Sequence, residues 1–204
     1  GGLVSLSHAV AEKRSDESVR DAYVREHGVR LLGGAKQFLD KYELEWRFCE
    51  IVSAKVHVSH DDDGNAMVRA LLDSPCGELL SHVTICAHGA VGRGQLDLGG
   101  VVALLAQTDR VKQIGLVDDR ATKSKMLVSR DFEPDQNLVT FGSLEGLWPK
   151  VERLKIACAD SAQIEVGDID APELRSLVLH TLRYGDGYSG EVSPLNDKFA
   201  EAKW

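Results

Sequence analysis

The sequence predicts an α/β fold in which a curved, mainly parallel sheet of repeated strands follows a helical N-terminal segment. An apolar triplet with constant internal spacing occurs around Val83, Ile114, Leu154 and Leu177, as expected when one strand-containing unit is used several times. Helical periodicity precedes these triplets along the chain. The intervals of 31, 40 and 23 residues between the centres are long enough for the crossovers that join parallel strands.

Residues 1–42 are expected to form a helical N-terminal cap. Ser15, Asp16 and Glu17 are typical of an N-cap with an acidic first turn, and apolar residues at helical spacing follow as far as Gly28. This pattern predicts a helix over about 16–27. Shorter helices are expected over 3–12 and 31–42.

Residues 43–204 are expected to form the repeat region. Alternation of apolar and polar side chains first predicts a pair of strands, and an amphipathic helix ending at Pro75 follows. The predicted strands lie near 44–48, 52–58, 81–87, 112–117, 152–158 and 175–180. An apolar helix at 101–107, an extra strand at 163–166 and a short helix over Phe199 and Trp204 complete the prediction.

The triplets match the LxxLxL strand of leucine-rich repeats. Their spacing is irregular for repeats of about 20–29 residues, and the ladder position where Asn or Cys is usual holds His88, Asp119, Ala159 and Leu182. The prediction is therefore an irregular leucine-rich-repeat-like solenoid with helices or loops on its convex side. Curved sheets of this kind usually bind other proteins.

The chain resembles bacterial repeat-companion-domain proteins in several segments. They are residues 1–33, LEWRFCEIVSAKV at 44–56, ALLDSPCGELLSHVTI at 70–85, and the stretch 147–179 with LWPKVERLKI and APELRSLVL. The resemblance implies a short helical domain before leucine-rich-like repeats, an extension before Gly1 and further repeats after Trp204. It implies no catalytic residues.

Composition narrows the classes of partner. Lys and Arg total 24 against 32 Asp and Glu, and the net charge of −8 disfavours binding to nucleic acid or anionic membranes. No apolar run approaches the roughly 18 residues of a membrane span. Four cysteines without a CxxC pair indicate neither a zinc cage nor a disulfide framework. The expected location is the cytoplasm.

Candidate chemical motifs are incomplete. The loop 61–65 resembles the start of a calcium loop, but position 12 is Leu72 instead of Glu, so a solvated turn is favoured. The glycine-rich stretch 88–95 lacks the Lys and Ser/Thr of a phosphate loop. We therefore expect no catalytic residue, cofactor or metal, and an enzyme with its site in the loops 89–95 or 118–137 is the least favoured alternative.

Strand parity identifies a candidate binding surface. If the triplet residues face the core, the alternate positions face outward, and none of those positions is acidic. The candidate partner-binding residues are His82, Thr84, Gln113, Val117, Arg153, Lys155, Ser176, Val178 and His180. The alternative explanation for the absence of acidic residues at these positions is chance together with the low β-propensity of Asp and Glu.

The sequence thus predicts a non-enzymatic protein-protein interaction module that binds an acidic protein partner. The alternative is a structural or accessory subunit of a larger assembly, which packs against its own copies or neighbouring domains.

Overall fold

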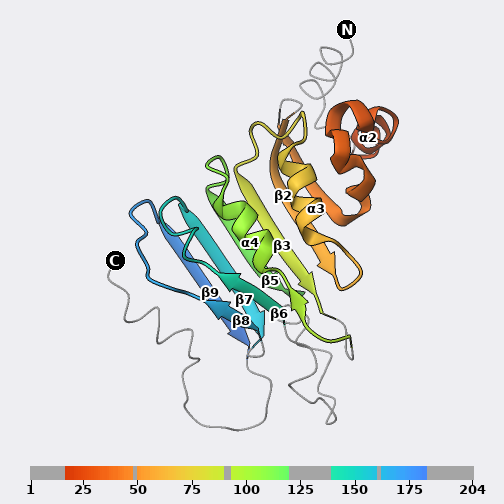
Figure 1. The fold of residues 1–204 in the computed structure, drawn as a ribbon. Coiled ribbons are helices and arrows are strands. Elements are labelled where there is room, and N and C mark those ends of the chain that lie inside the picture. The colour runs from red at the N-terminus through yellow and green to blue at the C-terminus, as the bar shows by residue number, and fades with distance from the viewer. Residues whose placement is uncertain (1–16, 48–49, 90–92, 120–138, 160–161, 183–204) are drawn as a thin grey trace.

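The computed structural model describes residues 17–47, 50–89, 93–119, 139–159 and 162–182. It shows a mixed α/β fold with a mostly parallel sheet (Figure 1). Its helical elements are α2 (Glu17–Leu32), the 3₁₀ helix η1 (Gly33–Lys41), α3 (Gly64–Leu72) and α4 (Gly99–Ala106). Its strands are β1 (Tyr42–Arg47), β2 (Glu50–Ser59), β3 (His82–His88), β4 (Leu96–Asp97), β5 (Gln113–Asp118), β6 (Val139–Ser143), β7 (Arg153–Ala159), β8 (Gln163–Glu165) and β9 (Ser176–Leu182).

Six strands form the main sheet in the order β1-β2-β3-β5-β7-β9. The β1-β2 pair is antiparallel, and every later pair in this sheet is parallel. All six strands lie close to the ranges that apolar alternation and the triplets predict. Each parallel strand therefore lies beside the strand that precedes it in this sheet along the chain.

A second sheet of three short parallel strands, β4-β6-β8, lies in the connections. The strand predicted at 163–166 is confirmed as β8, but the expectation of only helices or loops elsewhere on that side is wrong for β4 and β6. β4 has two residues, too few to show a periodic pattern. The fully buried Phe141 on β6 shows that this sheet contributes to the core.

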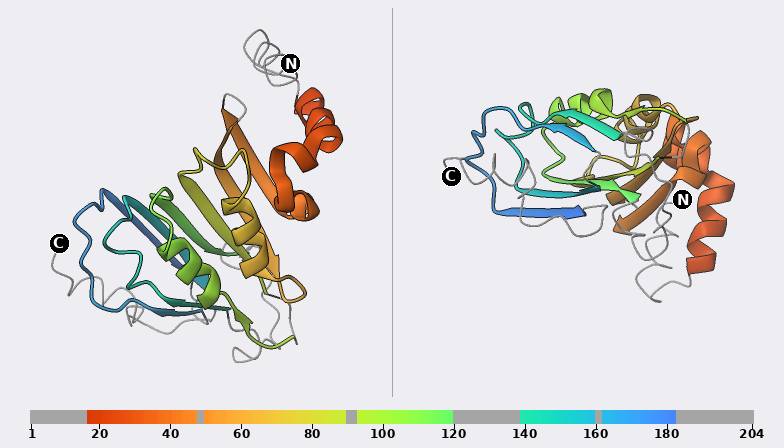
Figure 2. Two further views of the ribbon diagram at one scale, coloured as in Figure 1. Left: turned by 45° about the horizontal axis from the view of Figure 1, so that its top comes forward. Right: turned by 90° about the horizontal axis from the view of Figure 1, so that it is seen from below.

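One apolar core fills the space behind the main sheet, on the side covered by α3 and α4 (Figure 2). Val83, Ile114 and Leu154 are at most 2% exposed, so the triplet residues of β3, β5 and β7 face inward as predicted. Lys150 reaches into this core from the turn before β7, where its ammonium donates to the carbonyl of Leu105 over 2.7 Å and also to that of Thr108. These two bonds satisfy carbonyls at the C-terminal end of α4.

The predicted end of the first helix is wrong, because α2 continues through Gly28 to Leu32. A Cβ at Gly28 would lie 3.3 Å from the side chain of Lys36, so the glycine allows the following turn to pack closely. The helices predicted at 31–42, around 67–75 and at 101–107 correspond to η1, α3 and α4. α3 begins where Asp63 accepts a hydrogen bond from the backbone N–H of Ala66 over 2.9 Å, which fits the turn expected at 61–65.

Several expectations lie outside the described residues. They are the helices at 3–12 and 199–204, most of the segment 118–137, and Cys49. Among the described cysteines, Cys76, Cys86 and Cys158 are buried and form no disulfide. No helix in the described ranges is long and apolar enough to cross a membrane.

We predict that Tyr42→Phe changes the alkaline stability of the fold. The buried Tyr42 hydroxyl donates to the carbonyl of Met67 over 2.8 Å, and burial raises the pKa of the phenol. The folded state therefore retains the proton above about pH 10, where an unfolded tyrosine loses it, and this stabilising contribution is lost as pH rises.

Tyr42→Phe should lower the free energy of unfolding by about 1 kcal/mol at neutral pH and should make its decline above about pH 10 shallower. Urea unfolding followed by circular dichroism, at neutral pH and above about pH 10, measures the two effects. Equal alkaline declines in the two proteins would contradict the role given to Tyr42.

Candidate functional site

The outer face of the main sheet, opposite α3 and α4, carries all nine residues that strand parity selects. Strand register aligns them in three rows, because paired residues lie side by side on neighbouring strands. The rows, from β2 to β9, are Ser53, His82, Gln113, Arg153 and Ser176; Lys55, Thr84, Gly115, Lys155 and Val178; and His57, Cys86, Val117, Ala157 and His180. We refer to these rows as the outer face.

Exposure differs across the outer face. Arg153, Lys155 and His180 are exposed, and Val178 is 38% exposed. Gly115 in the middle row is buried, and a Cβ there would lie 2.7 Å from the hydroxyl of Thr84. The face is therefore flat near β3 and β5 and presents long side chains over β7 and β9.

Two cationic side chains dominate the β7 part of the outer face. Neither Arg153 nor Lys155 forms an ion pair or hydrogen bond within the described part of the chain, whereas Lys55 lies 3.0 Å from a carboxylate oxygen of Glu43. Guanidinium and ammonium groups without such a contact can donate hydrogen bonds to carboxylates of another molecule without first breaking an internal pair.

Strand β1 adds an acidic border that the sequence analysis did not include. Glu43 and Glu45 pair in register with Lys55 and Ser53, so both continue rows of the outer face. The absence of acidic residues thus holds for the outward positions of the four parallel strands β3, β5, β7 and β9, but not for the whole sheet. The antiparallel pairing of β1 places these carboxylates here, and the repeat pattern contains no signal for it.

His82 adds little positive charge to the outer face at neutral pH. Burial lowers its pKa, and Arg153 adds to this effect while Glu45 opposes it. Its two ring nitrogens lie 3.2 Å from the Ser53 hydroxyl and 3.3 Å from the Thr84 hydroxyl. His82 is therefore a neutral hydrogen-bonding group, and the basic character of the face depends on the lysines and Arg153.

The contacts of His82 and the burial of Cys86 also bear on whether the outer face holds an activated nucleophile. A serine nucleophile is usually activated by a histidine whose second ring nitrogen contacts a carboxylate, but the second nitrogen of His82 faces Thr84. Burial also raises the pKa of the Cys86 thiol to about 11, so this thiol stays protonated and weakly nucleophilic at neutral pH. Within the described ranges, no three or more His, Cys, Asp or Glu side chains are arranged to hold a metal ion.

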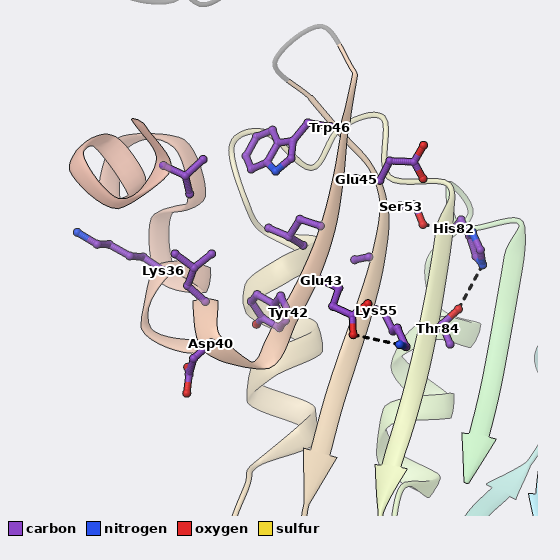
Figure 3. Close-up of a pocket in the computed structure, with 14 residues that line it drawn as sticks. Lys36, Asp40, Tyr42, Glu43, Glu45, Trp46, Ser53, Lys55, His82 and Thr84 are labelled. Atoms are coloured by element: carbon purple, nitrogen blue, oxygen red, sulfur yellow. Dashed lines mark hydrogen bonds and ion pairs between the residues drawn. The ribbon is translucent and has the colours of Figure 1, made fainter. Parts of the chain in front are cut away.

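A hollow of about 1040 Å³ runs beside β1, from the helical segment to the outer face (Figure 3). Its lining includes apolar side chains from α2, η1 and β1 and polar ones from β1, β2 and β3. The lining residues are Val24, Lys36, Leu39, Asp40, Tyr42, Glu43, Leu44, Glu45, Trp46, Ser53, Ala54, Lys55, His82 and Thr84. Trp46 packs against the core but is only partly buried, and it borders this hollow.

A chain of four polar side chains crosses the outer face at the C-terminal ends of β2 and β3. An oxygen of Glu43 lies 2.7 Å from His57 Nε2, His57 Nδ1 lies 2.7 Å from His88 Nε2, and His88 Nδ1 lies 2.9 Å from an oxygen of Asp119. The two imidazole rings are nearly parallel, with an interplanar angle of 21° and centroids 5.0 Å apart. We call these four residues the imidazole chain.

The imidazole chain is absent from the sequence predictions. His88 and Asp119 do occupy equivalent repeat positions, where an asparagine ladder would run in a regular repeat, and this equivalence was the available signal. Only the register of β2 against β3 brings His57 close to His88. In this register His57 pairs with Cys86, two residues before His88 on the same face of β3.

Comparisons of the chain with protein-family models, with curated proteins and with solved structures find no match.

Proposed function

We propose that this chain is a non-enzymatic protein-protein interaction module whose outer face binds an acidic surface of a partner protein. The observation that carries the proposal is that Arg153 and Lys155, on adjacent rows of β7, are exposed and form no ion pair or hydrogen bond with any other described residue. Opposite charges across an interface favour encounter and fix orientation. The neighbouring Val178, 38% exposed, supplies apolar area for the same contact.

The proposal extends to the wider architecture. The stepwise order β3-β5-β7-β9 in one sheet and β4-β6-β8 in the other supports an irregular leucine-rich-repeat-like solenoid of the repeat-companion-domain type. Such folds use an extended sheet face for binding. A cytoplasmic location is part of the same proposal, and the three described cysteines, which are buried and form no disulfide, support it.

Charge reversal on the outer face tests the proposal. Once a partner is identified by affinity capture with the wild-type chain, we expect Arg153→Glu with Lys155→Glu to weaken its binding by at least about tenfold, because attraction becomes repulsion at two adjacent positions. Titration calorimetry with the purified partner measures the change.

Arg30→Glu with Arg69→Glu is the matched control for this experiment. Both arginines are exposed, they lie on α2 and α3 away from the outer face, and the substitution changes the net charge equally. An equal loss of binding in both double variants would show a nonspecific effect of net charge and would contradict the proposed surface. Binding that survives Arg153→Glu with Lys155→Glu would also contradict the proposed surface.

The second candidate is an accessory subunit that packs against copies of itself, and the hollow beside β1 favours it. β1 is an edge strand, and the hollow touches five consecutive residues of it, Tyr42 to Trp46. Accessible strand edges are common sites of association. A molar mass by light scattering equal to the monomer over a wide concentration range would exclude self-association.

A further inference from the structure

We infer that His57 and His88 share one proton more than two neutral imidazoles carry, which makes the outer face a proton-binding surface. With both carboxylates ionised, all three contacts of the imidazole chain are hydrogen bonds only if this proton is present. Ionised carboxylates only accept hydrogen bonds. The contacts with Glu43 and Asp119 therefore need protons on His57 Nε2 and His88 Nδ1.

A neutral imidazole carries a single N–H group, so these two contacts use the only protons of both rings. Two bare nitrogen lone pairs would then face each other over the 2.7 Å between His57 Nδ1 and His88 Nε2, an arrangement that is repulsive. One further proton converts the clash into an N–H···N hydrogen bond. Three contacts hold three protons, and one ring of the pair is an imidazolium.

Protonation of Glu43 instead of an imidazole is disfavoured by its surroundings. Its carboxylate accepts from the Lys55 ammonium over 3.0 Å as well as from His57. These bonds, with that from Lys55 the larger, lower the pKa of Glu43. We therefore assign the extra proton to the rings and not to Glu43.

The groups that face the pair come from five strands or their ends. Glu43 on β1 and Asp119 after β5 favour the extra proton by direct contact. The opposing positive charges are Lys55 on β2, which contacts Glu43, and Lys155 on β7, in the middle row of the outer face. Cys86 on β3 pairs in register with His57 and is a neutral thiol. The carboxylates touch the rings and the ammonium groups do not, so the balance favours proton binding.

This proton links the proposed docking function to pH, a consequence that rests on that function. Proton loss lowers the charge of the outer face by one, beside the rows that carry Lys155 and His180. An acidic partner is then held less tightly. Binding is expected to weaken as pH rises through the range of about 5 to 8 in which histidine changes charge.

Nitrogen-15 NMR of the histidine rings tests the proton itself, because it reports which ring nitrogens are protonated. In the full chain, His57 and His88 are expected to titrate together as a coupled pair, with His57 Nε2 and His88 Nδ1 protonated throughout. In His57→Gln the titration of His88 should change, because its shared proton has no second imidazole. His60→Gln is the control: that ring contacts the Gly94 carbonyl over 3.0 Å instead, and its loss should leave His57 and His88 unchanged.

Independent titration of His57 and His88, with His88 unaffected by His57→Gln in a variant whose circular dichroism is native, would overturn the inference. A second readout is the free energy of unfolding. Above the pKa of about 6.5 of an unfolded histidine, the folded state keeps the extra proton that the unfolded state has released, so stability conferred by the pair falls as pH rises through this range. This fall should be present in His60→Gln and absent in His57→Gln.

A glutamate-rich peptide serves as the docking probe. We expect its affinity for the wild-type chain and for His60→Gln to fall about threefold or more between about pH 6 and pH 8, and to fall less in His57→Gln, which lacks the shared proton but keeps the other histidines of the outer face. No binding at either pH, with the coupled titration intact, would refute the docking function and leave the shared proton standing. Binding of the peptide together with independent titration of His57 and His88 would refute the shared proton and leave the docking function standing.

Discussion

Trp148→Ala is expected to lower the free energy of unfolding by about 3–5 kcal/mol, the range for removing a buried aromatic side chain. Trp148 has no exposed surface and lies in the turns between β6 and β7. Its indole N–H donates to the carbonyl of Val166 over 2.8 Å, which joins this turn to the end of β8. Because small domains have a total stability of only about 5–15 kcal/mol, the variant should be close to unfolding.

Trp148→Phe separates the two contributions of the indole. It keeps most of the apolar contact but leaves the Val166 carbonyl without this donor, at a cost of about 1–3 kcal/mol. Leu79→Ala is the surface control, since Leu79 is 54% exposed and its loss should change stability by less than about 0.5 kcal/mol. Urea unfolding followed by circular dichroism suits all three variants. Similar midpoints for Trp148→Ala and Leu79→Ala would show that the second sheet adds little to the core.

The second large effect is expected for Gly142→Ala, which should lower the free energy of unfolding by about 2–4 kcal/mol. Gly142 on β6 has φ +69°, and a Cβ there would lie 2.7 Å from the Cα of Gly99 at the start of α4. The substitution therefore combines left-handed backbone strain with a backbone clash that no rotamer relieves. β6 and α4 would have to move apart.

Gly94→Ala is the matched control for this prediction. Gly94 also has a left-handed φ, +82°, but no atom of the described residues lies within 4 Å of the Cβ position, so Gly94→Ala should cost only the strain of about 1–2 kcal/mol. The difference between the two variants, measured by thermal and urea unfolding, isolates the close approach of β6 to α4. Equal losses would mean that the clash is relieved without cost.

Much of the main sheet was predictable because its signal is local. The triplets around Val83, Ile114 and Leu154 alternate with polar residues at the period that a strand requires, and burial of one side of β3, β5 and β7 follows directly. The same parity places Arg153 and Lys155 outward. Each of these statements depends on residues within one strand.

The second sheet was less predictable. β4 has only two residues, and β6 contains Gly142 in a left-handed conformation with a register shift beside it. Neither element has a length or pattern that distinguishes it from a loop. Gly28 misled the sequence analysis for a related reason, since its role is packing against Lys36 and not termination of the helix.

Which side chains of each repeated strand point inward and which point outward follows from the sequence alone, because alternation is a property of a single strand. Which outward residues become neighbours depends on the folded sheet, because neighbours are set by the register between strands. That register brings Glu43, His57, His88 and Asp119 from four separate segments into one hydrogen-bonded chain. It also places an acidic border beside the basic rows, through an antiparallel pairing of β1 that no repeat encodes.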